Sequence, residues 1–156
     1  MSVTPPPSSA GLSPLNGAEE AVARELGRLI VILPRMLDAD LQRAKRMSLS
    51  EYSALRHLSE TPNRRMRMSE LAAACDMSLS GMTRLAGKLE SDGLVQRVRY
   101  ERDARGLEAV LTDAGLARLR EAWPAHLDSV RRHIFDHLTD IDMCKLADAL
   151  KAVNES

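Results

Sequence analysis

Aromatic residues are scarce in this chain of 156 residues, which holds two Tyr, one Trp and one Phe. Aliphatic side chains and methionine must therefore fill the interior of what the length suggests is one globular domain. No apolar run approaches the roughly 18 residues that a membrane span needs. The N-terminus also lacks the charged-then-apolar pattern of a signal peptide. We expect a cytoplasmic protein that does not enter a membrane.

Cysteine is equally scarce. Cys75 and Cys144 lie far apart and show neither metal-binding nor CxxC spacing. We interpret both as small buried apolar residues of a protein in a reducing compartment. Cys75 lies in the apolar run LAAACDM, where no basic neighbour lowers the pKa of its thiol. A redox role for either cysteine is the alternative.

Motifs that carry catalysis or bind metals are absent from the sequence. It contains no Gly-rich phosphate loop, no nucleophile elbow and no HExxH motif, so we expect neither an enzyme nor a cofactor. His133 and His137 have the four-residue spacing that can bind a metal on one helix face. Only His126 lies near them and no Glu or Cys completes the set, so we expect no metal site.

Net charge is zero, but the charges are unevenly placed. Residues 62–107 hold nine Lys and Arg against six Asp and Glu, a balance of +3. Residues 108–156 hold six against nine, a balance of −3. A basic segment beside an acidic one is typical of a phosphate-binding module on a neutral scaffold.

Apolar spacing predicts two helices in the first part of the chain. Residues 1–17, rich in Pro, Ser and Gly, should form a disordered tail. From 18 to 47 the apolar residues recur every three or four positions, which indicates an amphipathic helix with a kink or break at Pro34. Ser48 and Glu51 form a capping box for a second helix over 49–60.

Two shorter helices and a hairpin follow. Ser69 should cap a helix over 70–75, and Ser78 should cap another that runs to about Asp92 and ends at Gly93. After Gly93 the apolar period changes to two, which predicts two strands around the charged turn ERDARG.

The C-terminal third returns to a helical period. Thr112 and Asp113 begin a long helix whose apolar seam extends to Leu138, with a bend at Pro124. Thr139 and Asp142 begin a final helix. The order of helices and hairpin predicts a mainly α fold: a winged helix-turn-helix with a two-stranded β wing and an α-helical dimerisation lobe.

A helix-turn-helix followed by a hairpin is the layout of a DNA-binding module, because a helix fits the major groove and a hairpin reaches the adjacent minor groove or backbone. The second short helix offers hydroxyls and backbone N–H groups at its start, which suit phosphate. Arg84 could reach either a guanine edge or a phosphate. Lys88 lies on the same outward side, and Arg102 and Arg105 flank Asp103 at the hairpin tip.

The sequence in this region resembles the MarR family of transcriptional regulators. The matching elements are SELA, MSLSGMTRLAGKLESDGLV, the Asp-x-Arg of Asp103 and Arg105, and LTDAG, and the resemblance extends from about 18 to 153. It implies a homodimeric regulator, expected to repress transcription from a palindromic site in double-stranded DNA. By position it places Ser69 at a phosphate. The residues it places in the major groove are Ser78, Ser80, Gly81, Thr83 and Arg84. It also implies that Asp103 braces the wing and Arg105 inserts from it.

The family also implies an arrangement of the remaining parts. Residues 18–47 and 112–156 would form the dimerisation lobe, and residues 48–111 the DNA-binding lobe. A pocket between the two would take a small phenolic or anionic ligand, with Tyr52 and His57 as its polar candidates. The expected dimer contacts are Leu26, Leu119, Leu127, Ile134, Leu146 and Leu150. The alternative function is a winged helix used only for sequence-nonspecific DNA binding or for protein contacts.

Several positions depart from the family pattern. Ala104 stands where many relatives have a further arginine, although Arg102 partly makes up for its charge. Leu79 replaces a residue that is often polar or proline. Glu51 and Tyr52 stand where a Gln and an aromatic residue are common. These departures bear on base specificity rather than on the fold.

Overall fold

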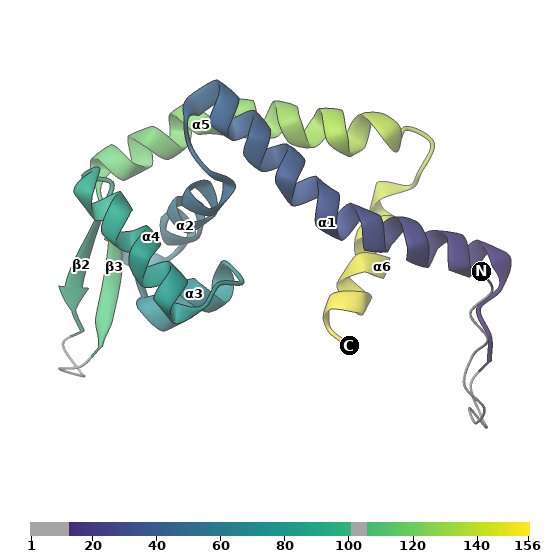
Figure 1. The fold of residues 1–156 in the computed structure, drawn as a ribbon, viewed down its shortest axis with the longest axis horizontal. Helices are drawn as coiled ribbons and strands as arrows, with labels where there is room; N and C mark the ends of the chain where they lie inside the picture. Colours follow the sequence, from purple (N-terminus) through teal and green to yellow (C-terminus); the bar gives the residue numbers. More distant parts are fainter. Residues whose placement is uncertain (1–12, 101–105) are drawn as a thin grey trace, which may run out of the picture. The chain divides into compact units, whose positions relative to one another are not determined.

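The structure is a computed structural model that describes residues 13–100 and 106–156. Its elements form two compact units, one up to Leu33 and one from Pro34 onward. Figure 1 shows the chain, whose helices are α1 (Gly17–Lys45), α2 (Leu49–Glu60), α3 (Met68–Ala74), α4 (Leu79–Ser91), α5 (Asp113–His133) and α6 (Met143–Asn154). The strands are β1 (Arg65–Arg67), β2 (Val95–Arg99) and β3 (Leu107–Leu111), and two 3₁₀ turns are η1 (Pro62–Arg64) and η2 (Phe135–His137).

Side-chain caps set where several helices begin. Ser48 accepts a hydrogen bond from the Glu51 N–H, while the Glu51 carboxylate accepts one from the Ser48 N–H at 2.6 Å, so the predicted capping box is confirmed. Ser78 caps α4 and Thr112 caps α5, because each hydroxyl accepts a hydrogen bond from a backbone N–H in the first turn of its helix. Asp142 caps α6 by accepting from two backbone N–H groups.

The boundaries of three helices differ from the prediction. Helix α3 begins at Met68, so Ser69 lies inside its first turn and does not cap it. Helix α1 continues through Pro34, so the break expected as one alternative is absent, and the other alternative, a kink, stays a prediction. Helix α5 ends at His133, because Ile134 leaves helical geometry at φ −124° and ψ −70°. The predicted seam through Ile134 to Leu138 is therefore not one continuous helix.

The wing belongs to a three-stranded antiparallel sheet in the order β1-β3-β2. The predicted hairpin is confirmed, with Val95 opposite Leu111 and Arg99 opposite Leu107. Strand β1, which the sequence analysis missed, adds only three residues and pairs Met66 with Ala109. It ties the segment before α3 to the base of the wing.

The core of the second unit lies between α2, α3, α4, α5 and the sheet, and Figure 1 shows α2, α3 and α4 packed beside the strands. Gly115 allows α5 to begin there, because a Cβ at this position would lie 2.1 Å from the Leu94 carbonyl oxygen. The side chains that the core buries almost completely include Leu41, Tyr52, Leu55, Leu58, Leu71, Met82, Leu89 and Val95.

Asp40 joins the C-terminal part of α1 to the end of α5. Its carboxylate accepts hydrogen bonds from the Ser129 hydroxyl at 2.7 Å and from Arg132 at 3.1 Å, and His133 Nε2 lies 2.8 Å away. The hydrogen bonds from Ser129 and His133 lower the pKa of Asp40 to about 2. These contacts anchor the two helices to each other through polar groups.

Candidate nucleic-acid interface

Helix α4 divides into a buried and an exposed side. Met82, Ala86 and Leu89 are at most 2% exposed and fix the helix to the core. The opposite side presents Thr83 and Arg84 to solvent. This division leaves a polar and cationic helix surface available for a partner.

Hydroxyl groups crowd the N-terminus of α4. The Ser78 hydroxyl accepts from the Gly81 N–H at 3.1 Å and lies 3.2 Å from the Ser80 hydroxyl. A Cβ on Gly81 would lie 3.1 Å from Ser78 Oγ, so the glycine leaves room for this cap. Thr83 Oγ1 donates to the Leu79 carbonyl at 2.8 Å, which leaves its oxygen lone pairs free to accept.

A shallow pocket of about 260 Å³ lies between α3, the start of α4 and the base of the wing. Ser69 and Thr83, predicted separately, both line it, beside the exposed apolar side chains of Leu79 and Leu107. Its other lining residues are Arg67, Met68, Tyr100 and Gly106. The pocket therefore brings hydroxyls, apolar surface and a cation together on the side of α4 next to the wing.

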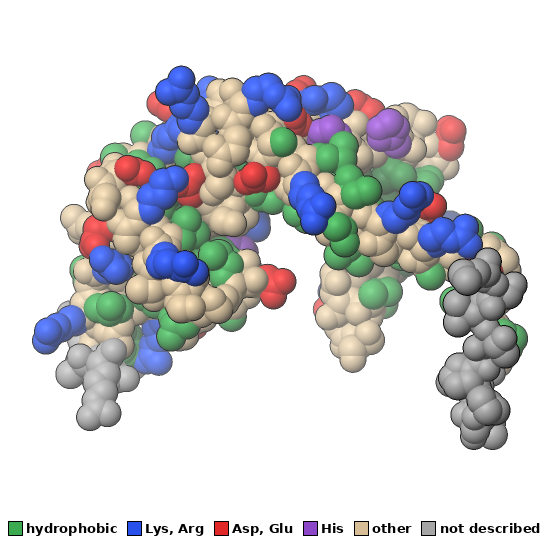
Figure 2. Space-filling view, viewed as in Figure 1, with side chains coloured by type: hydrophobic (Ala, Val, Ile, Leu, Met, Phe, Trp, Pro, Cys, Tyr) green, Lys and Arg blue, Asp and Glu red, His purple; other side chains and the backbone are tan. Residues whose placement is uncertain are grey.

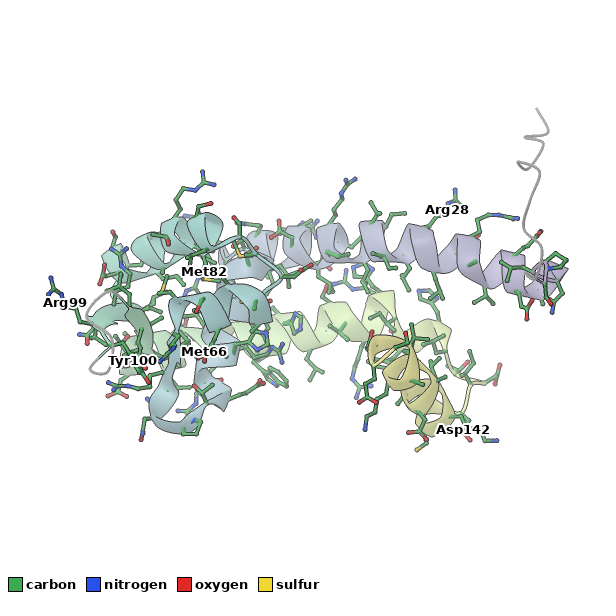
Figure 3. All side chains as sticks on the ribbon, turned by 90° about the horizontal axis from the view of Figure 1, so that it is seen from below. Arg28, Met66, Met82, Arg99, Tyr100 and Asp142 are labelled. Carbon is green, nitrogen blue, oxygen red and sulfur yellow. The ribbon has the colours of Figure 1, made fainter. Side chains whose placement is uncertain are left out.

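Arg67 and Tyr100 form a contact that the sequence analysis missed. The Arg67 guanidinium lies 4.0 Å from the centre of the Tyr100 ring, which is cation–π geometry. Figure 3 shows Tyr100 at the base of the wing and the neighbouring Arg99 pointing away from the strands. A contact across 33 sequence positions leaves no local pattern, so only the tertiary structure reveals it.

Two ion pairs attach the polar side of α4 to neighbouring elements. Glu90 accepts from the Arg97 guanidinium at 2.6 and 2.8 Å and from the Arg97 N–H at 3.0 Å, which links α4 to β2. The Lys88 ammonium donates to Oε1 of Glu51, which links α4 to the start of α2. Lys88, predicted to face DNA, is thus held by a carboxylate.

Both members of the second pair are charged at neutral pH. Burial raises the pKa of Glu51, but hydrogen bonds from Lys88 and Ser48 outweigh it and hold the pKa below its ordinary value. The Glu51 hydrogen bond raises the pKa of Lys88. The contact is therefore a charged pair rather than a neutral one.

The tip of the wing, with Arg102, Asp103 and Arg105, lies outside the described residues. The strands that carry it are closed by the Tyr100 N–H, which donates to the Gly106 carbonyl at 2.9 Å. In Figure 2, Lys and Arg side chains lie over α3, α4 and the neighbouring strands.

A second pocket, of about 290 Å³, lies between α2 and α5. Tyr52, predicted to contact a ligand, lines it, whereas His57 does not. The Tyr52 hydroxyl and His126 Nδ1 are buried and have no hydrogen-bond partner among the described residues. Their rings stack with centres 4.3 Å apart. Burial raises the pKa of Tyr52 to about 12 and lowers the pKa of His126, so both rings are neutral at neutral pH.

The six predicted dimer residues occupy different surroundings. Leu119 is only 7% exposed and belongs to the core of its own chain. Leu26, Leu127 and Leu150 are 41–46% exposed, while Leu146 and Ile134 are half-buried. Helix α6 has no buried residue. The exposed leucines remain candidates for contact with another chain.

No helix in residues 13–100 and 106–156 is long and apolar enough to cross a membrane. Within the same ranges, no three His, Cys, Asp or Glu side chains are grouped closely enough to hold a metal ion.

Comparison with known proteins identifies the family. The MarR family model matches residues 47–106. Two solved structures from Streptomyces coelicolor are each similar over 92% of this chain. The MarR family transcriptional regulator AbsC is 38% identical, with 97% of its own chain covered and a TM-score of 0.80. The MarR family transcriptional regulator Sco3205, solved in complex with DNA, is 35% identical, with 91% of its own chain covered and a TM-score of 0.81.

A curated relative, the transcriptional repressor MprA of Escherichia coli K12, is 36% identical over 73 residues, which are 47% of this chain. That match spans only about two fifths, 42%, of the repressor's length. The two Streptomyces regulators match over nine tenths or more of both chains, with the same winged-helix fold. The chain therefore belongs to the MarR family of transcriptional regulators.

Proposed function

We propose that the protein is a ligand-responsive repressor that binds a palindromic site in double-stranded DNA as a homodimer, with one α4 helix in each half-site. The observation that carries this proposal is the division of α4. Its inner side is buried in the core, and its outer side exposes Ser80, Thr83 and Arg84. A rigidly held helix with small polar and arginine side chains outward suits the major groove.

The residues in the proposed interface have separate roles. Ser80, Thr83 and Arg84 face base edges, and Ser69 and the capped N-terminus at Ser78 and Gly81 lie against phosphates. Leu79 is 54% exposed and suits an apolar group such as a thymine methyl. In the wing, Arg105 and Arg102 enter the minor groove, where a narrow groove strengthens the negative potential, and Asp103 braces Arg105.

Exposed apolar surface supports the homodimer. Leu150 and Val153 of α6 are 46% and 70% exposed, and α6 buries no residue within its own chain. Phe135 and Ile141, both exposed, line a groove of about 440 Å³ between the end of α5 and α6. A second copy would cover this surface, and twofold symmetry would place the two α4 helices about one helical turn of DNA apart.

The pocket at Tyr52 supports the ligand response. It offers the Tyr52 hydroxyl and His126 Nδ1, which have no hydrogen-bond partner in the described part of the chain. It also offers the Arg56 cation and the apolar walls of Trp123 and Leu127. A small phenolic or carboxylate-bearing ring would pair with those two polar atoms and would give Arg56 an anionic partner in addition to Glu60. Because the pocket joins α2 of the winged helix to α5, a ligand with different affinity for two spacings of the α4 helices would shift DNA binding.

Two relatives support the repressor and DNA assignments. MprA is described as a transcriptional repressor, and Sco3205 was solved in complex with DNA. The alternative, sequence-nonspecific DNA binding or protein contacts only, predicts that no sequence is preferred.

Selection from fragmented host DNA tests the proposal. Purified protein should enrich fragments that share one palindrome, and fluorescence anisotropy should show binding to that palindrome at least a thousandfold tighter than to a scrambled duplex. Equal affinity for both duplexes would establish the sequence-blind alternative. Absence of binding to any duplex at low salt would leave protein contacts as the function.

Ligand binding has a built-in probe, because the only tryptophan in the chain, Trp123, lines the pocket. Titration with salicylate and other hydroxybenzoates should change Trp123 fluorescence and weaken binding to the palindrome. Tyr52→Phe removes only the hydroxyl. It should reduce the effect of the ligand both on Trp123 fluorescence and on binding to the palindrome. If the ligand changes DNA binding equally in Tyr52→Phe and the unsubstituted protein, the ligand acts elsewhere.

A further inference from the structure

Glu51 has two roles at the start of α2, one for each carboxylate oxygen. Oε2 accepts the Ser48 N–H at 2.6 Å and completes the helix cap, while Oε1 accepts the Lys88 ammonium. The carboxylate is buried, with its side chain 6% exposed, whereas the Lys88 side chain is 62% exposed. A buried anion thus holds the end of a solvent-exposed cation on α4.

Lys88 lies near the proposed DNA surface. It follows Arg84 by four residues on α4, so the two side chains are neighbours on the helix surface. The Lys88 stem is long and flexible, and its ammonium would be a typical phosphate contact if no carboxylate held it. Asp92, the residue that follows the end of α4, adds a second negative charge that stabilises the charged form of Lys88.

We infer that Glu51 withholds Lys88 from the DNA backbone and thereby limits the sequence-independent part of DNA affinity. Phosphate contacts dominate nonspecific binding, and each releases counterions from the duplex. A lysine already neutralised by a buried carboxylate releases none. The Glu51–Lys88 ion pair holds α4 against α2, and it also keeps one cation from contributing to the attraction between the protein and the DNA phosphates. This inference rests on the proposed binding of DNA by α4.

The substitution Glu51→Gln separates the two roles of the carboxylate. The glutamine amide oxygen can still accept the Ser48 N–H and preserve the cap. Its amide no longer carries the charge that holds Lys88. Anisotropy with a labelled mixed-sequence duplex, measured over a series of salt concentrations, should then show tighter binding at low salt. The slope of log affinity against log salt should steepen by about 0.9 per bound subunit, or about 3.5-fold in affinity per subunit over a fourfold change in salt.

Glu60→Gln is the matched control. It makes the same change of charge on the same helix, but Glu60 pairs with Arg56 at 3.2 Å, at the far end of α2 from Lys88. Its slope should equal that of the unsubstituted protein. The double variant Glu51→Gln/Lys88→Met should also return to the unsubstituted slope, because the freed cation is gone.

Two results would overturn the inference while the protein still binds DNA. Glu51→Gln with an unchanged slope would show that a freed Lys88 does not reach the backbone. A double variant with a slope shallower than that of the unsubstituted protein would show that Lys88 already contacts phosphate. Absence of salt-dependent binding by the unsubstituted protein would instead remove the proposed function, and this inference with it.

Discussion

The winged helix and helix α6 belong to the same compact unit but use their apolar residues in opposite ways. In the winged helix, Leu55, Leu58 and Met82 are completely buried within their own chain. In α6 no residue is buried, and Leu150 and Val153 are exposed. The first region therefore packs its apolar side chains within its own chain, whereas the second leaves apolar surface that no described residue of the chain covers.

Polar contacts show the same contrast. The winged helix is crossed by ion pairs between elements, such as Glu90 with Arg97. The ion pairs of α6 join only neighbouring turns, Lys145 with Asp142 and Lys151 with Glu155, both at 3.8 Å and exposed. Such local exposed pairs contribute little to stability. The difference teaches that substitutions in the winged helix should affect folding, and those in α6 should affect assembly.

The largest effect should come from a cavity in the winged-helix core. Leu55→Ala removes a completely buried side chain and should lower the free energy of unfolding by about 2–5 kcal/mol. Leu150→Ala, the same change on α6, should cost less than about 1 kcal/mol at protein concentrations where the chain is monomeric. Urea unfolding over a range of protein concentrations measures both. Equal losses in dilute solution would mean that α6 packs within its own chain.

Assembly should be lost when a charge enters the α6 surface. Leu150→Asp places a carboxylate where the proposed partner would bury it, so sedimentation should show monomers and affinity for the palindrome should fall at least about tenfold. Asn154→Asp adds the same charge at an exposed polar position of α6 and should leave dimers intact. Dimers of Leu150→Asp would place the interface elsewhere.

A more moderate effect is expected at the outer side of α4. Arg84→Ala should weaken binding to the palindrome by about 1–3 kcal/mol if the guanidinium reads a base. Arg120→Ala removes an exposed arginine from α5 and serves as the control. Equal losses on palindromic and scrambled duplexes would assign Arg84 to a phosphate instead.

The smallest effect concerns Asp40, whose carboxylate joins α1 to α5. Its pKa of about 2 lies below the ordinary value of 3.8, so its contribution to stability is fully present above about pH 4 and is lost as the pH falls toward 2. Asp40→Asn should destabilise the protein by on the order of 1–2 kcal/mol at pH 7. Urea unfolding at pH 7, 4 and 3 should show this difference shrinking with acidity. A difference independent of pH would assign the effect to packing.

Local signals predicted the winged helix well. Ser48, Ser78, Thr112 and Asp142 each cap the helix that follows them, because a cap depends on residues two or three positions away. The same reasoning was wrong for Ser69, because α3 follows directly on β1, which pairs with β3, and begins two residues earlier than predicted. A strand of three residues is too short for an alternation of apolar and polar residues to be recognised.

The candidate site was predicted in part. The exposed side of α4, with Thr83 and Arg84, followed from helical periodicity. The pairing of Lys88 with Glu51 joins residues 37 positions apart, and the contact of Tyr52 with His126 joins residues still further apart. Periodicity assigns a residue to a helix face, but it does not show which residue of another element lies opposite.

The sequence by itself determined the order of the helices and the two wing strands, the caps at Ser48, Ser78, Thr112 and Asp142, and the residues on the outer side of α4. These features depend on neighbours within one or two turns. The tertiary structure alone decided which charges are free and which are held. Lys88 and Arg84 look equivalent along α4, yet the buried carboxylate of Glu51 lies within hydrogen-bonding distance of Lys88 only. The physical reason is that the strength of an ion pair depends on distance and burial, and both are set by how α2 packs against α4.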